Sequence, residues 1–246
     1  MSGGEKLVVV PARRASTRLP DKLLLAESGY PLLAHTLMQC QKSCAGRVVA
    51  AVDDQELAAA ARSCGAEVVM TDSNLASGSD RVHAAVSELG FDGMVVNVQG
   101  DEPEIDPAAI DEVFAALAAG NQVATLATPL IDPGLLEDPA AVKVVIRQDG
   151  CALYFSRAPI PHFRTSDLAV PLLHIGVYGF QAATLEEFAA SAPTPLELTE
   201  GLEQLRLLEM GHEIAVRQWP RAFPGIDTRE DYDSFLARNK RQSPQT

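Results

Sequence analysis

Basic and hydroxyl side chains are crowded into residues 11–22, which read PARRASTRLPDK. The guanidinium groups of Arg13 and Arg18 match phosphate oxygens with their fork geometry, and Lys22 adds a point charge. The hydroxyl of Ser16 can donate a further hydrogen bond. The segment is neither a Walker loop nor a G-x-G-x-x-G turn. It therefore predicts an anion site suited to a triphosphate, with a solvated basic loop as the alternative.

A carboxylate in a second segment, Asn-Val-Gln-Gly-Asp-Glu-Pro at residues 97–103, could hold a metal ion. Mg²⁺ is typically bound by one or two carboxylates together with substrate phosphates. Asp101 is the predicted ligand, since Gly100 allows close approach of the backbone; an aspartate that caps a loop is the alternative. Asp227 is a second candidate ligand, although an aspartate before a threonine at a helix start is also an ordinary N-cap.

The overall charge makes the basic cluster informative. Lys and Arg total 20 against 33 Asp and Glu, which gives a net charge of −13. This sum argues against nucleic-acid or membrane partners, so an anionic substrate needs a local basic island. We find neither a signal-peptide pattern nor an apolar stretch of about 20 residues. The four cysteines lack metal-site spacing, so reduced thiols and a cytoplasmic location are expected.

The elements that position these residues alternate between strands and helices. Strands are expected at 7–10, 47–52, 67–70, 93–98, 123–129, 142–147, 152–156, 175–180 and 213–217. Helices are expected at 31–44, 55–63, 79–89, 107–119, 197–210 and 227–239. This order predicts an α/β fold, a Rossmann-like three-layer sandwich with a mostly parallel sheet. The two segments that carry the candidate site residues, 11–22 and 99–103, each directly follow a predicted strand. Ligands bind beyond the carboxyl ends of the strands in such folds.

Five further segments complete a resemblance. They read SGSDR at 77–81, AAVKVV at 140–145, ALYFSR at 152–157, HIGVYG at 174–179 and LEQLR at 202–206. With the segments at 11–22 and 97–103, and in the same order, they resemble the cytidylyltransferases that activate acidic sugars. The match is closest to the 3-deoxy-manno-octulosonate (Kdo) cytidylyltransferase family, over about residues 7–237.

The resemblance implies a role for each matching residue. Those expected to bind the nucleotide CTP are Arg13, Ser16, Arg18, Lys22, Ser77, Gly78, Arg81 and Gln99. Those expected to bind the sugar are Gln99, Arg157, His174, Tyr178, Glu203 and Gln204. Asp101 and Asp227 would bind Mg²⁺, and Arg13, Lys22 and Asp101 would be catalytic. For His174 and Tyr178 a core role is the alternative, and for Glu203 a solvated helix charge.

The resemblance also implies the reaction and the organisation. The anomeric hydroxyl of the sugar would attack the α-phosphorus of CTP and release pyrophosphate, for lipopolysaccharide biosynthesis. Since no general base stands out, activation by Mg²⁺ is the simpler expectation. We expect one nucleotide-diphospho-sugar-transferase-like domain at 1–240 with a small peripheral lobe. The resemblance also implies a homodimer. The parts of the chain are a nucleotide part at 7–125, a sugar and dimerisation part at 126–217, a closing helix at 227–239 and a flexible tail at 241–246.

Some residues depart from the family pattern. Asp21 stands where glycine is usual, Ser79 and Asp80 replace threonine and glutamate, and Leu173 replaces an arginine. These departures leave the sugar open, with an 8-amino-octulosonate or a sialic acid as alternatives. Sugar-1-phosphate nucleotidyltransferases differ by a G-x-G-T-R turn. A catalytically silent nucleotide-binding or scaffold protein would be expected to lack the metal ligand or the phosphate cations, which are all present.

Overall fold

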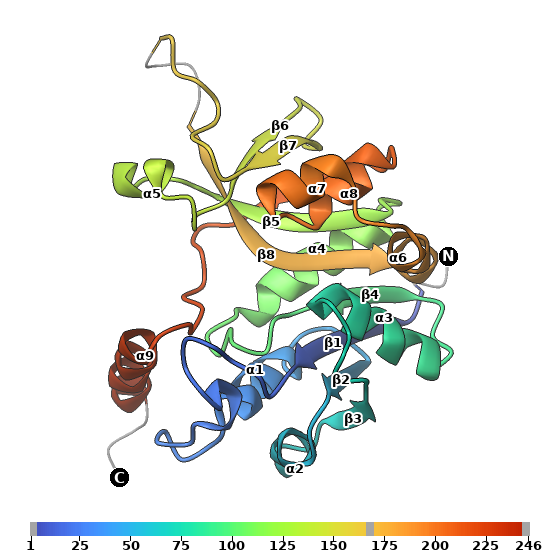
Figure 1. Ribbon diagram of the computed structural model, residues 1–246, viewed down its shortest axis with the longest axis vertical. Helices are drawn as coiled ribbons and strands as arrows, with labels where there is room; N and C mark the ends of the chain where they lie inside the picture. Colours follow the sequence, from blue (N-terminus) through green and yellow to red (C-terminus); the bar gives the residue numbers. More distant parts are fainter. Residues whose placement is uncertain (1–3, 166–169, 243–246) are drawn as a thin grey trace. The chain divides into compact units, whose positions relative to one another are not determined.

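The computed structural model describes residues 4–165 and 170–242. The chain divides into two compact units. The first unit comprises Glu5–Asp111 and Phe223–Thr246, and the second comprises Glu112–Ala222 and Met1–Gly4. The boundary falls within helix α4, Pro107–Ala118, which is coloured green in Figure 1. The prediction of a single domain over 1–240 stays a prediction, and each unit is described by itself.

The first unit is built on four parallel strands. They are β1 (Lys6–Ala12), β2 (Arg47–Val52), β3 (Glu67–Met70) and β4 (Met94–Asn97). Their order in the sheet is β3-β2-β1-β4, and each neighbouring pair is parallel. The apolar run Leu7–Val10 in β1 is fully buried, as expected for a parallel strand with both faces covered. The predicted α/β class is confirmed here.

Helices connect these strands and cover the sheet (Figure 1). They are α1 (Leu32–Cys40), α2 (Gln55–Ser63) and α3 (Gly78–Glu88), with a 3₁₀ turn η1 at Lys22–Leu24 and α9 at Arg229–Gln242. Right-handed crossovers place α1 and α2 on one face and α3 on the other. Asp54 caps α2 by accepting hydrogen bonds from the backbone N–H groups of Glu56 and Leu57. Ser77 caps α3 in the same way, through the N–H of Asp80.

The strand order has a switch point between β1 and β4. From β1 the chain moves outward to β2 and β3, and then returns to β4 on the opposite side of β1. The loops after β1 and β4 therefore lie side by side at the carboxyl edge of the sheet. Their contact is close, because a Cβ atom on Gly100 would lie 3.1 Å from the carbonyl oxygen of Pro11. The buried hydroxyl of Thr36 donates to the carbonyl of Gly100 and fixes this loop.

The second unit holds a mixed sheet. Its strands are β5 (Val123–Pro129), β6 (Lys143–Ile146), β7 (Ala152–Ser156), β8 (Leu172–Gln181) and β9 (Ile214–Gln218). Strand β5 is antiparallel to β8 and parallel to β9, and β6 is antiparallel to both β7 and β8. Its helices are α5 (Pro133–Glu137), α6 (Ala182–Ala190), α7 (Pro195–Glu200) and α8 (Gln204–Glu209).

The observed structure corrects one predicted helix and contains three elements that the sequence patterns did not predict. The single helix expected at 197–210 is wrong, since α7 and α8 are separate helices. Gly201 adopts a left-handed conformation with φ of 63° between them and ends α7. The sequence patterns missed η1, α5 and α6. Of the tail expected at 241–246, residues 241 and 242 belong to α9 and the rest lie outside the described residues.

None of the helices in the described ranges is long and apolar enough to cross a membrane.

Candidate active site

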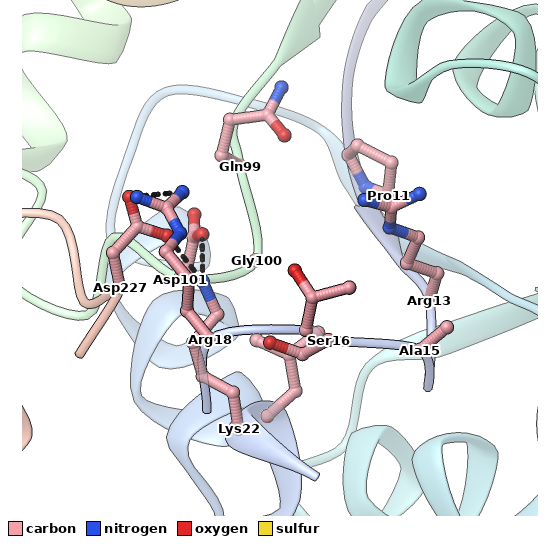
Figure 2. A pocket seen from close by; sticks show the side chains of 12 residues that line it. Pro11, Arg13, Ala15, Ser16, Arg18, Lys22, Gln99, Gly100, Asp101 and Asp227 are labelled. Carbon is pink, nitrogen blue, oxygen red and sulfur yellow. Dashed lines mark hydrogen bonds and ion pairs between the residues drawn. The ribbon is translucent and has the colours of Figure 1, made fainter. Parts of the chain in front are cut away.

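A cavity of about 260 Å³ lies at the switch point of the first unit. This volume is near the lower end of small-ligand pockets, roughly 300 Å³. Its lining residues are Pro11, Arg13, Ala15, Ser16, Thr17, Arg18, Lys22, Leu23, Gln99, Gly100, Asp101 and Asp227. The structure thus gathers most of the residues predicted to bind the nucleotide and both predicted metal ligands around one space (Figure 2).

Cations and carboxylates meet directly in this cavity. The Nζ atom of Lys22 lies 2.6 Å from Oδ2 of Asp101 and 3.0 Å from Oδ1 of Asp227. The guanidinium of Arg18 lies 3.0 Å from the other carboxylate oxygen of Asp227. Figure 2 shows both basic side chains pointing toward the two carboxylates. The Lys22 side chain is only 10% exposed, so its ammonium depends on these partners for the hydrogen bonds that water would supply.

From Phe223 the chain belongs to the first unit again, and this segment contributes Asp227 to the cavity. The backbone N–H of Ile226 donates to the carbonyl of Asp101 at 3.0 Å, which fixes the two segments together. At the start of α9, the carboxylate of Asp231 accepts from the backbone N–H groups of Asp227 and Thr228. The N–H of Asp231 in turn donates to the Thr228 hydroxyl. Because Thr228 and Asp231 satisfy this helix start, the N-cap interpretation of Asp227 is wrong and its carboxylate faces the cavity.

The donor set fits a magnesium ion. Asp101 and Asp227 both direct an oxygen to the Lys22 ammonium, so their carboxylates converge on a place occupied by positive charge. Within residues 4–165 and 170–242, no group of three or more His, Cys, Asp or Glu side chains could hold a metal ion. Two carboxylates without a third protein ligand suit Mg²⁺, which takes its remaining ligands from phosphates and water.

Glu102, next to the proposed metal ligand, is a feature that the sequence patterns missed. Its Oε2 atom is buried without a hydrogen-bond partner in the described part of the chain. Burial, and then the charge of Asp101, raise the pKa of the Glu102 carboxyl to about 8. Nothing in the sequence distinguishes Glu102 from a solvated glutamate, since its burial depends on tertiary packing.

The residues at the start of α3 have structural partners. The Ser77 hydroxyl caps the helix and donates to the carboxylate of Asp80, which gives this departure from the family pattern a local role. A Cβ on Gly78 would lie 3.6 Å from the side chain of Gln99, which places this turn beside a cavity residue. Arg81 is 3% exposed and is paired with Asp53. Contacts of these side chains with a nucleotide stay predictions.

The predicted sugar-binding residues apart from Gln99 lie in the second unit, where two of them form an aromatic pair on β8. The rings of His174 and Tyr178 have centroids 5.2 Å apart, and a ring nitrogen of His174 lies 3.0 Å from the Thr125 hydroxyl. Burial lowers the pKa of His174 to about 3, so its imidazole is neutral. Burial, and then the Glu203 carboxylate, raise the pKa of Tyr178. The Tyr178 hydroxyl is buried without a hydrogen-bond partner among the described residues.

Arg157 connects β7 to the link between α7 and α8. Its guanidinium donates to the backbone carbonyls of Glu200 at 2.8 Å, Pro139 at 2.9 Å and Gly201 at 3.2 Å. Two and three residues after Gly201, Glu203 is the N-cap of α8 and Gln204 is its first residue. The structure therefore brings Arg157 close to the segment that carries these two residues. Whether the guanidinium also contacts a substrate carboxylate stays a prediction.

A parallel sheet whose switch point carries a basic loop and two convergent carboxylates is typical of nucleotide-binding α/β proteins. The cytidylyltransferase family model matches residues 7–214 of this chain. The chain is 46% identical over 233 residues to the 3-deoxy-manno-octulosonate cytidylyltransferase of Anaeromyxobacter dehalogenans (strain 2CP-1), with 94% of this chain and 96% of that protein covered. It therefore belongs to the 3-deoxy-manno-octulosonate cytidylyltransferase family of nucleotidyltransferases, as its motifs predicted.

Solved structures agree with this assignment. The structure of a CMP:2-keto-3-deoxy-manno-octonic acid synthetase complexed with CTP is similar, with a TM-score of 0.93, 31% identity and coverage of 97% of this chain and 100% of that chain. A cytidylyltransferase from Leptospira borgpetersenii is similar with a TM-score of 0.63 and 16% identity, over 95% of this chain and 85% of that chain. The second match shows the fold alone. The predicted fold class is confirmed.

Proposed function

We propose that this enzyme transfers CMP from CTP to 3-deoxy-manno-octulosonate and releases pyrophosphate. The observation that carries the proposal is the cavity at the β1–β4 switch point, where Arg18 and Lys22 contact the carboxylates of Asp101 and Asp227 and Arg13 is a further basic lining residue. The family, whose matched members carry the name of this reaction, supports the same conclusion.

The basic loop would bind the triphosphate and stabilise its departing part. Arg13 and Arg18 offer forked donors, Lys22 a compact charge and Ser16 a hydroxyl, all lining the cavity. When the anomeric hydroxyl attacks the α-phosphorus, negative charge grows on the leaving pyrophosphate. Once the bound triphosphate has become the partner of these cations, they stabilise the transition state without further reorganisation. Catalysis would then rest on positioning and electrostatics.

Magnesium is the cofactor we propose, held by Asp101 and Asp227. When bound, the ion would neutralise charge on phosphate oxygens and lower the pKa of a hydroxyl near it. For these carboxylates to accept it, Lys22 and Arg18 must leave them, and the triphosphate oxygens offer those two side chains new partners. The arrival of the nucleotide thus exchanges one set of opposite charges for another within the same cavity.

The acceptor-binding residues that we propose in the second unit are Arg157, His174, Tyr178, Glu203 and Gln204, and the candidate in the first unit is Gln99. The neutral imidazole of His174 and the unpaired Tyr178 hydroxyl are suited to hydrogen bonds with sugar hydroxyls. Arg157 would provide a cation for the sugar carboxylate. Of these residues, Gln204 is the least exposed to solvent, at 7%.

The direct test offers one sugar at a time with CTP and Mg²⁺ and measures pyrophosphate release. We expect 3-deoxy-manno-octulosonate to give the highest kcat/KM. Leu173, which stands where the family pattern has an arginine, removes a cation from a segment that can sense the sugar. A preference for the 8-amino-octulosonate or for a sialic acid would replace the acceptor in the proposal. Absence of release with all three sugars would overturn it.

We further propose a cytoplasmic homodimer whose product is used for lipopolysaccharide. All four cysteines are free thiols, which suits a reducing compartment. In the second unit, Leu153 of β7 is 58% exposed and Leu198 of α7 is 70% exposed, and such apolar side chains are suited to a subunit interface. Sedimentation analysis of the purified enzyme should give twice the chain mass of 26.2 kDa, and a monomer would refute the dimer.

A further inference from the structure

Arg14 differs from the other three cations of segment 11–22, which line the cavity. Its Nε atom lies 3.0 Å from Oδ1 of Asp21, and its Nη1 atom lies 3.1 Å from Asp54 and 2.9 Å from Glu56. Its backbone N–H donates to the carboxylate of Asp53 at 2.9 Å. These carboxylates come from the end of β2, the start of α2 and the far end of the basic loop. Arg14 is therefore directed away from the cavity and anchored.

Asp21 has an uncommon backbone conformation. Its φ of 50° and ψ of 27° lie in the left-handed region, and it is the one residue other than glycine with a positive φ in the part of the chain that the structure describes. This region favours glycine, and a side chain there must be held by its surroundings. The Asp21 carboxylate has its ion-pair partner in Arg14, seven positions earlier. The next residue is Lys22, which faces Asp101 and Asp227.

We infer that Arg14 and Asp21 form a latch that closes the basic loop at both ends and positions Ser16, Arg18 and Lys22 for the triphosphate. The inference rests on the proposed function for its ligand. Both residues are positioning residues, because neither lines the cavity. The latch also gives a structural role to an acidic residue beside a phosphate site, since the carboxylate of Asp21 pairs with the guanidinium of Arg14.

The latch acts by restricting the loop before the ligand arrives. Residues 15–20 run between two ends that the Arg14–Asp21 pair keeps together, so fewer loop conformations are lost when phosphate binds. Arg14 is itself tied to β2 and α2, which fixes the loop to the sheet as well as to itself. Without the pair, the side chain of Asp21 no longer restrains the loop end, so the backbone there can change conformation and move the Lys22 ammonium.

A simpler interpretation of Asp21 predicts the opposite change in CTP affinity. If Asp21 were only a negative charge near the phosphates, its neutralisation would strengthen CTP binding. The variant Asp21→Asn separates the two, because asparagine tolerates the left-handed conformation and keeps the side-chain shape without the charge. The latch predicts weaker CTP binding, by about two- to fivefold, the range for a partly exposed ion pair.

The experiment is a double-mutant cycle with Asp21→Asn, Arg14→Gln and the double variant. CTP affinity is measured by calorimetry with Mg²⁺, together with KM and kcat. We expect each single variant to raise Kd and KM about two- to fivefold with kcat nearly unchanged, and the double variant to be no worse than either single variant. Unchanged or tighter binding by Asp21→Asn, or additive losses in the double variant, would overturn the latch.

Two measurements separate the latch from other effects. Asp92→Asn makes the same change of net charge at an exposed residue of the first unit, and it should leave CTP affinity unchanged; an equal loss there overturns the latch. Amide hydrogen exchange of residues 14–22 needs no ligand, and it should speed up about two- to fivefold in both single variants. Unchanged exchange overturns the latch. If exchange responds while the unaltered enzyme fails to bind CTP, the latch stands and the proposed function fails.

Discussion

The carboxylate of Asp101 has two possible partners, the Lys22 ammonium that it contacts in this structure and the magnesium ion that we propose. Both partners need its negative charge. Asp227 shares this arrangement, with Lys22 on one oxygen and Arg18 on the other. The chemistry of the cavity therefore depends on the negative charges of Asp101 and Asp227.

Replacing Asp101 tests its catalytic role. Asp101→Asn should keep the fold and lose roughly 2.7–4 kcal/mol of transition-state stabilisation, the cost of removing one electrostatic group in comparable sites. This corresponds to a kcat about 10²–10³-fold lower, measured as pyrophosphate release. Circular dichroism and the unfolding midpoint serve as the control for folding. Near-normal turnover would show that Asp101 does not hold the ion.

A second prediction concerns Lys22 and the metal in the absence of nucleotide. Because the ammonium occupies both carboxylates, Lys22→Gln should bind Mn²⁺, a spectroscopic substitute for Mg²⁺, about tenfold more tightly. A tenfold gain corresponds to about 1.4 kcal/mol, which is close to the lower limit of roughly 1.5 kcal/mol for a single charged hydrogen bond, so the factor is a minimum. Electron paramagnetic resonance of free Mn²⁺ measures the affinity directly.

The control for this titration is Lys42→Gln, which removes an equal charge from an exposed residue of the first unit. It should leave Mn²⁺ affinity as it is. Equal gains in both variants would assign the effect to overall charge and would contradict competition at the carboxylates.

At the residue scale, the sequence predicts which kinds of side chain form the site, but it does not predict which side chains pair with one another. The positions of Lys22 and Asp101 after parallel strands, and the family resemblance for Asp227, predicted one site, and the structure gathers all three residues around one cavity. The pairing of Arg81 with Asp53, and the anchoring of Arg14, could not be predicted in the same way. These pairs join side chains 28 and 40 positions apart, and no periodicity or spacing encodes such a contact.

At the scale of elements, the α7–α8 pair shows how a buried ion pair replaces a continuous helix. Glu197 in α7 accepts hydrogen bonds from the guanidinium of Arg206 in α8, with Nε at 2.7 Å. The two side chains are only 8% and 9% exposed. Gly201 turns the chain between them, so the ion pair holds together two short helices that neither length nor propensity would stabilise alone.

Glu197→Gln should destabilise the protein by roughly 3–5 kcal/mol, since it removes the negative charge of Glu197 from a buried ion pair. Burial alone would raise the pKa of Glu197, but hydrogen bonds from Arg206 and from the Thr194 backbone lower it below the usual 4.5. The ionised pair therefore stabilises the fold above about pH 4.5, and this contribution is lost as the pH falls through the lowered pKa. Denaturant unfolding at several pH values measures both effects.

The matched control is Glu186→Gln, at an exposed position of α6. Its unfolding free energy should stay within about 0.5 kcal/mol of the unaltered protein. A loss for Glu197→Gln that persisted undiminished at a pH low enough to protonate Glu197 would show that packing, rather than charge, accounts for it.

The elements of the first unit were more predictable than those of the second. Its strands are continuous apolar runs, and the helices α2 and α3 between them begin at side-chain caps. The ranges expected for β2 and α2 match those observed. In the second unit the helix expected at 197–210 failed because the apolar spacing continues through Gly201. Only the positive φ of that glycine reveals the break.

At the scale of the whole molecule, one basic island attracts an anion to a chain of net charge −13. CTP that binds only the folded protein should stabilise it by about 2.7 kcal/mol when its concentration is 100 times Kd. Thermal unfolding with CTP and Mg²⁺ should show the corresponding rise in midpoint. Arg13→Gln should lose most of this rise, because Arg13 lines the cavity.

Arg62→Gln removes an equal charge from an exposed residue of α2 and should keep the full rise. A rise that survives Arg13→Gln intact would place CTP elsewhere on the molecule.

The return of the chain to the first unit has a consequence for biosynthesis. Lys22 and Asp227, which meet in one cavity, are translated 205 positions apart, and Ile226, Tyr232 and Phe235 complete the core of the same unit. During synthesis on the ribosome, the earlier part of this unit must therefore wait with an apolar surface uncovered while the whole second unit emerges. A nascent chain cannot assemble the complete cavity until residues 223–242 are made.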